Sequence, residues 1–495
     1  MRMNISLCAL AVAVTLGGAV TAAQKTRCER ILERFGDPLV DATCVESKDL
    51  TTNNPDTTPQ NGSLPGRPAS AFTPQTDRAT IAPDPAHKTP ITMKVPGVQI
   101  NAYIASDPTG QARFLLRLPD DWNGRLVVAG PSGTRSEFNG DFAWSDYVVQ
   151  KGYAYASQNK GVLNIRNVYL VPPPEPDLLA CRLNPSTAIS VHFYDNDAGQ
   201  QFTRWAVFMA EGARLARRGV EARYGREARR TYAVGTSNGA YQVRKAIESY
   251  PELFDGGVDW EGTFVDAERP NLLTDLPPAI LNFPAYVASG LDANSTAAKN
   301  IRLAGYPPDI VVGATSLWTN HSNSFWEVTQ CQWQKRLDPT YDTYGAGTGT
   351  YNYWARRSVS DVGANIEAFA TTGKIRRPLI TVAGTMDALL PIDHHARAYA
   401  RKVAAELAER GDDEEGDGKA AYRLYEVQNG NHIETYKTQF PQLEFIEPHA
   451  QRAFDLLVDA VEHRAGLPPS QCIPRAEAIA SSPRQPGHCA NLFVP

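Results

Sequence analysis

Hydrophobic and polar residues alternate with a period of two over residues 98–104 and again over residues 113–118. This alternation is typical of strands, and the two segments are predicted to form an antiparallel pair. A short continuous apolar run follows at residues 126–129 and ends at Gly130, and residues 152–157 are another candidate strand. This part of the chain therefore predicts the beginning of a β-sheet.

Farther along the chain, strand patterns alternate with helical patterns. Residues 200–224 have apolar side chains at the helical spacing expected for a helix packed on a sheet, at Trp205, Phe208, Met209, Ala213 and Leu215. Strands are predicted at residues 231–235, 256–260, 379–383 and 422–427, and helices at residues 241–250, 395–410 and 451–463. Strands that alternate with helices require βαβ crossovers, so the pattern predicts an α/β fold with a mostly parallel central sheet flanked by helices.

Residues 263–374 interrupt this alternation and are rich in aromatic side chains. The aromatic residues are Trp318, Phe325, Trp326, Trp333, Tyr341, Tyr344, Tyr351, Tyr353 and Trp354. We interpret the segment as one inserted cap, or lid, domain over the carboxyl ends of the strands. Two interpretations of the aromatic residues stay open: they bind an aromatic or extended apolar part of a substrate, or they form the core of the cap itself.

The N-terminus has the features of a secretory signal peptide over residues 1–23. Arg2 precedes an uncharged stretch with an apolar run at residues 7–16, and small residues follow. The apolar run is too short and too rich in glycine and threonine for a comfortable membrane anchor. We therefore expect a secreted or periplasmic protein that has no integral membrane association once the signal is cleaved.

Residues 24–91 are predicted to be an N-terminal strap that contains cysteines, followed by a linker rich in proline and threonine. Cleavage of the signal would remove Cys8 and leave an even number of cysteines, which in an exported chain favours disulfides. They are Cys28, Cys44, Cys181, Cys331, Cys472 and Cys489. Six cysteines allow 15 pairings, and the sequence does not choose among them. The simplest arrangement joins Cys28 to Cys44 and Cys472 to Cys489, with Cys181–Cys331 as a long-range link.

Composition and charge exclude several classes of function. The 495 residues include 49 Lys+Arg and 54 Asp+Glu, a net charge of −5, so there is no basic surplus for binding nucleic acid. The mean hydropathy of −0.36 excludes a polytopic membrane protein. The cysteines lack the CxxC spacing of zinc sites, so no metal is predicted from them. The length would suffice for two to four domains at roughly 100–200 residues each, yet the pattern predicts one catalytic domain with one insertion.

The pentapeptide Gly235-Thr236-Ser237-Asn238-Gly239 lies between a predicted strand and a predicted helix. This is the GxSxG pattern of a nucleophile elbow, in which the serine occupies a strained strand-to-helix turn. The two glycines let the neighbouring backbone approach closely, and the helix N-terminus points its amides at developing negative charge. We predict that Ser237 is a nucleophile; the alternative is a serine that caps an ordinary helix.

A serine nucleophile needs a base, and the base needs a carboxylate that orients it. For this elbow the expected chain order is Ser, acid, His. Asp387 follows the strand at residues 379–383, and His432 follows the strand at residues 422–427, so both lie on loops past strand ends. We predict Asp387 as the acid and His432 as the base.

Other residues compete for these two roles. Asp259 and Glu261 close an earlier strand, where some hydrolases place the acid, whereas Asp393 is interpreted as an acid in the first turn of a helix. Among the remaining histidines, His192 and His321 could reach the site from a loop or from the cap. Only His432 has the position expected for the base.

An oxyanion hole needs two backbone N–H donors, one of them from the residue after the nucleophile, Asn238. The second is expected from the loop at residues 130–134, where Pro131 has no N–H and Ser132 or Gly133 is left. Candidates for contact with the substrate are Trp260, Glu261 and Trp326. This constellation implies no metal and no organic cofactor.

Apart from the aromatic insertion, residues 95–465 resemble the α/β-hydrolase superfamily. The segments 122–130, 140–143 and 151–154, together with Phe254-Asp255-Gly256-Gly257 after the elbow, are similar to secreted esterases of the tannase/feruloyl esterase and 3-hydroxybutyrate-oligomer hydrolase type. Thr236 and Asn431 stand where tannases commonly carry two bonded cysteines, and the calcium-binding loop of the tannase cap is not recognised. The resemblance implies a serine esterase and leaves its substrate open.

Together these features predict an exported serine carboxylic-ester hydrolase that acts through an acyl-enzyme, on aromatic or hydroxyalkanoate esters. Its hydrolase core is predicted over residues 92–262 and 375–465, with a tail at residues 466–495. Two alternatives stay open: a serine peptidase or amidase of the same fold, and a catalytically inactive hydrolase-fold binding protein.

Overall fold

The computed structural model describes residues 25–58, 89–133, 136–161, 166–168, 181–184, 186–187, 190–192, 202–341, 350–411 and 421–495. The predicted signal peptide and most of the predicted linker lie outside these residues. Over the described ranges, no helix combines the length and the apolar character needed to cross a membrane.

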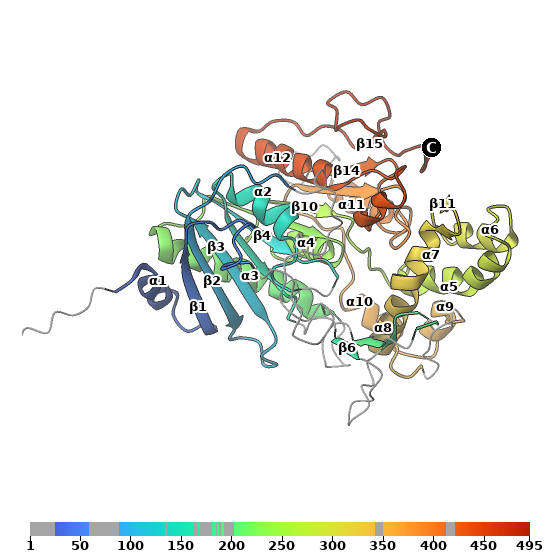
Figure 1. The fold of residues 1–495 in the computed structure, drawn as a ribbon, viewed down its shortest axis with the longest axis horizontal. Helices are drawn as coiled ribbons and strands as arrows, with labels where there is room; N and C mark the ends of the chain where they lie inside the picture. Colours follow the sequence, from blue (N-terminus) through green and yellow to red (C-terminus); the bar gives the residue numbers. More distant parts are fainter. Residues whose placement is uncertain are drawn as a thin grey trace, which may run out of the picture.

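A ten-stranded sheet forms the centre of the molecule (Figure 1), with the strand order β1-β2-β3-β5-β4-β9-β10-β13-β14-β15. The strands are β1 (Leu39–Ser47), β2 (Gly97–Ile104), β3 (Arg113–Pro119), β4 (Arg125–Gly130), β5 (Ala154–Gln158), β9 (Arg230–Thr236), β10 (Gly256–Trp260), β13 (Leu379–Gly384), β14 (Tyr422–Val427) and β15 (Gln471–Ile473). The pairs from β1 to β5 are antiparallel, and every pair from β5 to β15 is parallel. The predicted mostly parallel sheet is confirmed.

Helices cover both faces of this sheet. One face packs against α3 (Thr203–Tyr224), α4 (Asn238–Ser249) and α11 (Ala396–Glu409), and the other against α2 (Asp146–Val149) and α12 (Glu447–His463). Each layer has its own apolar core. With both faces covered, the parallel strands β4, β13 and β14 are almost entirely buried, which explains the continuous apolar run of β4.

Helix α3 illustrates how the sequence pattern becomes packing. All five apolar residues that predicted it are buried. The helix ends at Gly225, which has a left-handed φ of 70° and donates its N–H to the carbonyl of Glu221. Glycine adopts this conformation without a Cβ penalty and is therefore a common helix terminator. On its outer side α3 contacts α1 (Arg27–Phe35), the first helix described.

The chain leaves the sheet after β10 and returns to it at β13 through the segment interpreted as the cap. It contains α5 (Leu272–Ala288), α6 (Thr296–Leu303), β11 (Val311–Val312), β12 (Thr315–Ser316), α7 (Leu317–His321), the π-helix η4 (Ser322–Trp326), α8 (Glu327–Leu337), α9 (Tyr353–Arg357) and α10 (Val362–Glu367). Trp318, Trp326, Trp333, Tyr351 and Tyr353 are all buried in one apolar cluster. Of the two interpretations of these aromatic residues, the structure favours a core for the cap itself, with Trp354 exposed.

Both ends of the chain contribute strands to the edges of the sheet. The predicted strap supplies β1, which pairs with β2, and the predicted tail supplies β15, which pairs with β14. The sheet therefore extends beyond residues 92–262 and 375–465. The strand β1 escaped the sequence pattern because only one of its faces packs, with several exposed residues along it.

Three disulfides join elements that lie side by side. Cys28–Cys44 connects α1 to β1, Cys181–Cys331 connects β7 (Cys181–Arg182) to α8, and Cys472–Cys489 connects β15 to the chain that follows it. This is the simplest of the arrangements considered from the sequence. β7 belongs to a small three-stranded sheet with β6 (Arg166–Val168) and β8 (Ser190–His192), in the order β6-β8-β7. The Cys181–Cys331 disulfide thus attaches this small sheet to the cap.

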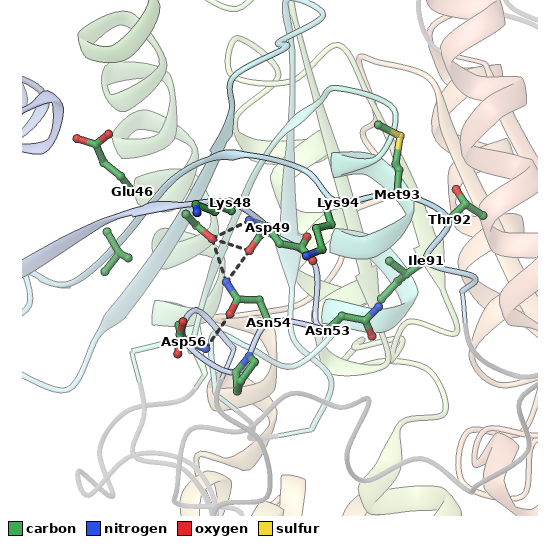
Figure 2. Close-up of a pocket in the computed structure, with 13 residues that line it drawn as sticks. Glu46, Lys48, Asp49, Asn53, Asn54, Asp56, Ile91, Thr92, Met93 and Lys94 are labelled. Atoms are coloured by element: carbon green, nitrogen blue, oxygen red, sulfur yellow. Dashed lines mark hydrogen bonds between the residues drawn. The ribbon is translucent and has the colours of Figure 1, made fainter.

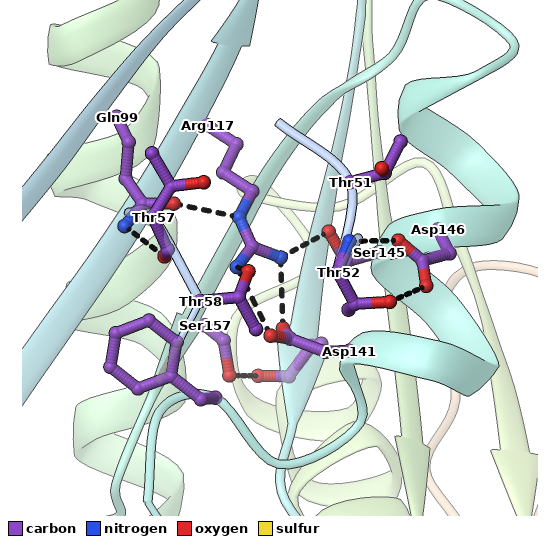
Figure 3. Close-up of polar contacts among 12 residues, drawn as sticks. Thr51, Thr52, Thr57, Thr58, Gln99, Arg117, Asp141, Ser145, Asp146 and Ser157 are labelled. Atoms are coloured by element: carbon purple, nitrogen blue, oxygen red, sulfur yellow. Dashed lines mark hydrogen bonds and ion pairs between the residues drawn. The ribbon is translucent and has the colours of Figure 1, made fainter. Parts of the chain in front are cut away.

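A buried ion pair anchors the end of the strap to the sheet (Figure 3). Arg117 on β3 donates to both carboxylate oxygens of Asp141, at 2.9 and 3.0 Å, and also to the hydroxyl of Thr58. Asp141 begins the π-helix η3 (Asp141–Ser145), and neither charged side chain is exposed. The backbone N–H of Thr52 donates to Asp146 at 2.9 Å. Residues 51–58 are therefore an integral part of the folded core.

Candidate active site

Ser237 occupies the turn between β9 and α4, with φ 58° and ψ −120°. A non-glycine residue at positive φ is strained, and the surrounding backbone holds it there: the Ser237 N–H donates to the Trp260 carbonyl, and the Ser237 carbonyl accepts from Tyr241. A Cβ on Gly239 would lie 2.0 Å from the carbonyl oxygen of Gly130. The glycine of the motif is thus required by the close approach of β4 to the start of α4.

Ser237, His432 and Asp387 form a continuous chain of hydrogen bonds. His432 Nε2 lies 2.9 Å from Ser237 Oγ, and His432 Nδ1 lies 2.8 Å from Asp387 Oδ2. This geometry fits an imidazole that donates from Nδ1 to the carboxylate and accepts the serine proton at Nε2. The structure brings together the three residues that the sequence analysis selected.

Asp387 lies on the loop after β13, and its own loop holds it in place. Its Oδ1 accepts from the backbone N–H groups of Leu389 and Leu390 at 2.8 and 2.7 Å. Burial alone would raise the pKa of Asp387, but the charge and hydrogen bond of His432 and these two N–H groups lower the pKa below its ordinary value. The carboxylate is therefore ionised at neutral pH.

The loop after β14 carries His432 back over the sheet. Gly430 packs so closely against Gly384 that a Cβ at position 384 would lie 2.3 Å from the Gly430 carbonyl oxygen. Asn431 ties this loop to the acid loop through a hydrogen bond from its Nδ2 to the Met386 carbonyl. Burial lowers the pKa of His432, but the charge and hydrogen bond of Asp387 outweigh it, and with a contribution from Glu261 the pKa rises to about 9.

Glu261 is a second buried carboxyl group at the same imidazole. It follows β10 with a positive φ of 57°, and its Oε2 lies 3.5 Å from His432 Nδ1. Its Oε1 accepts from the Gly384 N–H at 2.9 Å. Burial, together with the charge of Asp387, raises the pKa of Glu261 to about 8. The structure places Glu261 behind the histidine, buried, and not on a surface that a substrate could reach.

The other competitors for the acid role are held in ion pairs elsewhere. Asp259 is completely buried; it pairs with Arg244 at 2.5 Å and accepts from Thr381 and from the Gly262 N–H. Asp393 is half exposed and pairs with Arg397 at 3.0 Å. Neither carboxylate contacts His432, so the geometry does not support Asp259 as the acid of the base. Asp393 lies in the turn that precedes α11 (Ala396–Glu409) and not in the first turn of the helix, where the sequence placed it.

The candidate oxyanion hole lies between Asn238 and the loop after β4. Asn238 is the first residue of α4, so its N–H has no partner within the helix. The N–H of Ser132 donates to Asn139 Oδ1 at 2.8 Å and is therefore engaged. Gly133 is the better second donor, and its carbonyl is 3.5 Å from the side-chain amide of Asn238.

Lys160, which no sequence signal indicated, supports the same loop. Its side chain is completely buried, and Nζ donates to the Pro131 carbonyl. Nζ also lies 5.8 Å from the centre of the Trp205 ring. A buried ammonium needs such partners because desolvation is costly, so Lys160 and the oxyanion loop position each other.

Trp260 and Trp326, predicted to contact the substrate, are both buried. The indole N–H of Trp326 donates to the Ala388 carbonyl at 2.7 Å, which connects the cap to the loop that carries Asp387. Trp260 packs edge-on against Trp144 in the apolar core on the face of the sheet that α2 and α12 cover. Glu261 is buried as well, and the contacts of all three residues are to other parts of the protein, so the structure gives them supporting positions.

His321 brings the cap close to the candidate triad. It ends α7, lies edge-on against Tyr436 at 5.3 Å, and is near enough to Asp387 and His432 for their charges to affect it. Burial lowers the pKa of His321 to about 4, so its imidazole is neutral. Its Nδ1 lies 2.9 Å from the Leu317 carbonyl. The side chain of His192, the other histidine considered, lies outside the described residues.

Glu261, Asp387 and His432 are also the group of side chains in the described ranges whose spacing could suit a metal ion, since their ligand atoms lie within 4.8 Å of one another. Both nitrogens of His432, however, are already engaged with Ser237 and Asp387. A metal would have to displace one of these hydrogen bonds. The arrangement therefore fits proton transfer better than metal ligation.

A hollow of about 630 Å³ lies at the N-terminal strap (Figure 2). Lys48, Asp49 and Asn54 line it from one side and Ile91, Met93 and Lys94 from the other. The candidate site residues are not among its lining residues. We therefore do not assign this hollow to the substrate.

Comparison with solved structures decides the fold. Feruloyl esterase B from Aspergillus oryzae superposes with a TM-score of 0.51, over 92% of this chain and 93% of that chain, at 12% sequence identity. The chain has the α/β-hydrolase fold. Strand order, elbow position and the order of Ser237, Asp387 and His432 along the chain all agree with this assignment.

Comparison of sequences gives a second relationship, which covers part of the chain. Residues 325–490 match the 3HB-oligomer hydrolase (3HBOH) family. D-(-)-3-hydroxybutyrate oligomer hydrolases from Burkholderia thailandensis and Burkholderia pseudomallei are 30% and 28% identical over 133 and 141 residues. These matches cover 25% and 26% of this chain but 17% and 18% of the relatives, so the chain spans less than a fifth of their length.

Proposed function

We propose that the protein is a serine carboxylic-ester hydrolase with Ser237 as nucleophile, His432 as general base and Asp387 as the acid that orients the base. The observation that carries this proposal is the hydrogen-bonded chain from Ser237 Oγ through both nitrogens of His432 to Asp387 Oδ2. Neutral serine is a weak nucleophile, and this chain supplies the base that activates it.

In the proposed reaction Ser237 Oγ attacks the acyl carbon while its proton passes to His432 Nε2. The N–H groups of Asn238 and Gly133 donate hydrogen bonds to the carbonyl oxygen and so stabilise the negative charge that develops on it. His432 then donates the proton to the departing alcohol, which leaves an acyl-enzyme. A water molecule, deprotonated by the same imidazole, hydrolyses the acyl-enzyme and restores Ser237.

We propose oligomers of a short hydroxyalkanoate as the first substrate class to test. The match of residues 325–490 to the 3HB-oligomer hydrolases supports this choice. The aromatic ester class has less support from the cap, since most of the aromatic side chains there pack against one another. Export through a cleaved signal remains part of the proposal, and the three disulfides are consistent with an oxidising compartment.

A panel of substrates tests this function. The panel contains short p-nitrophenyl esters, hydroxybutyrate dimers and trimers, gallate and hydroxycinnamate esters, and aminopeptidase substrates. Turnover of the hydroxybutyrate oligomers above the other classes supports the proposal. Preferential turnover of the aminopeptidase substrates would contradict the proposal and indicate a serine peptidase. A folded protein that hydrolyses nothing and does not react with a fluorophosphonate would be the inactive binding protein.

A further inference from the structure

Two carboxyl groups reach the same nitrogen of His432. Asp387 Oδ2 lies 2.8 Å from His432 Nδ1, and Glu261 Oε2 lies 3.5 Å from the same nitrogen. The two acids come from different strands: Glu261 directly follows β10 and Asp387 follows β13, its neighbour in the sheet. Only one carboxylate is needed to orient an imidazole, so the second requires an explanation.

The backbone directs Glu261 toward the histidine. Its positive φ of 57° is unfavourable for a glutamate, and its N–H donates to Val382 while its Oε1 accepts from Gly384, both on β13. Oε1 is thereby occupied, and Oε2 faces His432 with no hydrogen-bond partner in the described residues. An unpartnered carboxyl oxygen, buried and strained into this position, points to a role at the imidazole.

Charge decides the state of this second carboxyl group. The groups that act on it are Asp387, His432, Glu434 and the Gly384 N–H. Burial and the two neighbouring acids favour the neutral form, and His432 and Gly384 favour the ionised form. Because two negative charges in this dry site repel each other, Asp387 carries the charge at neutral pH and Glu261 keeps its proton.

On this geometry we propose that Glu261 is a second positioning acid for His432, held in reserve behind Asp387 and able to accept the Nδ1 proton when Asp387 is absent. The inference rests on the proposed function of Ser237 and His432. In the intact protein one negative charge, on Asp387, compensates the imidazolium. Without Asp387 the repulsion disappears, Glu261 releases its proton to solvent, and its carboxylate takes the hydrogen bond from Nδ1.

The test compares Asp387→Ala with the double variant Asp387→Ala/Glu261→Gln. Two rates are measured for each: hydrolysis of an ester that the unaltered protein turns over, and covalent labelling of Ser237 by a fluorophosphonate. Glutamine has the shape of glutamate and still accepts from Gly384, but it cannot provide a negative charge. We expect Asp387→Ala to lose about 10- to 100-fold in both rates, and the double variant to lose about 10⁴-fold, as when a triad has no acid.

Asp393→Asn is the matched control, because Asp393 is an acid of the same loop region that pairs with Arg397 away from the imidazole. It should label and hydrolyse like the unaltered protein. Equal rates for Asp387→Ala and the double variant would overturn the role of Glu261. Failure of the unaltered folded protein to label Ser237 or to hydrolyse any ester would instead overturn the proposed function itself.

A second measurement decides the matter if Asp387→Ala does not fold. In the otherwise unaltered protein Glu261 ionises above about pH 8, and over that range its charge contributes to the raised pKa of His432. Glu261→Gln should therefore move the acidic limb of the profile of kcat/KM against pH to lower pH. A merely structural glutamate would change stability and leave this limb in place, and an unmoved limb would overturn the proposal.

Discussion

His432 Nε2 lies 2.9 Å from Ser237 Oγ, although the two residues are 195 positions apart in the chain. Parallel strands of one sheet end at a common edge, and the loops after β9, β13 and β14 meet there. The contact is thus a consequence of the sheet topology. The site needs no movement of the backbone before Ser237 can transfer its proton.

Replacement of Ser237 should abolish ester hydrolysis without unfolding the protein. Ser237→Ala removes the nucleophile, and we expect a loss of at least about 10³-fold in kcat. The melting temperature should stay nearly unchanged, because alanine keeps the Cβ and hence the same backbone strain at this turn. Ser249→Ala, an exposed serine at the other end of the same helix, is the control. Undiminished hydrolysis by Ser237→Ala would contradict the mechanism.

The pH dependence follows from the raised pKa of His432. The base works only when its imidazole is neutral, and a pKa near 9 keeps it protonated over a wider range of pH than an ordinary histidine. We expect kcat/KM to rise from pH 6 through pH 8 and to level off only above about pH 9. A profile that is already flat at pH 6.5 would show that Asp387 does not raise the pKa of the base.

Lys160→Met should lower kcat with little change in KM. Loss of the ammonium frees the Pro131 carbonyl and allows the oxyanion loop to move, whereas Ser237 and His432 keep their hydrogen bond. A displaced loop loses a contact that forms only in the transition state, so kcat decreases while ground-state binding of the substrate is unchanged. We expect about a 10-fold decrease in kcat. Steady-state kinetics on one ester measures both constants. If only KM changed, Lys160 would not support the oxyanion loop in the transition state.

Removal of one partner of the buried pair Arg117–Asp141 should destabilise the fold far more than removal of one partner of an exposed pair does. Asp141→Ala leaves the buried guanidinium of Arg117 without the carboxylate that it pairs with, and we expect a loss of about 3–5 kcal/mol in the free energy of unfolding by urea. Glu33→Ala breaks the exposed pair with Lys25 and should cost less than about 1 kcal/mol. Similar losses for the two variants would mean that the strap is not anchored through Asp141.

The alternation of strands and helices predicted most of the sheet and its large helices to within a few residues. The segments that escaped include the edge strand β1, the short strand β15 and the cap helices, as well as the helices α1 and α2 and the small sheet β6-β8-β7. Edge strands show less of their pattern because one side is solvated, and β15 is only three residues long. Short helices such as α7 and α9 lack the length over which a helical period can be recognised.

The residues of the candidate triad were identifiable because a serine elbow, and loops after strands, leave local signals. The supporting residues were not. Lys160 supports the oxyanion loop through a contact that no local pattern shows. Glu261 was weighed as an acid after an earlier strand and also placed among the substrate contacts, because nothing local shows on which side of a strand end a side chain lies. These assignments depend on distances between segments that are far apart in sequence.

The sequence by itself determined the fold class, the elbow at Ser237, and the order of nucleophile, acid and base, because periodicity and turn residues are local properties of the chain. Only the tertiary structure decided that the cap aromatics form a core, that Ser132 has its N–H engaged, and that a second carboxyl group stands at His432. Burial and electrostatic coupling depend on which strands become neighbours. Glu261, Asp387 and His432 come together only because β10, β13 and β14 are neighbours in the folded sheet.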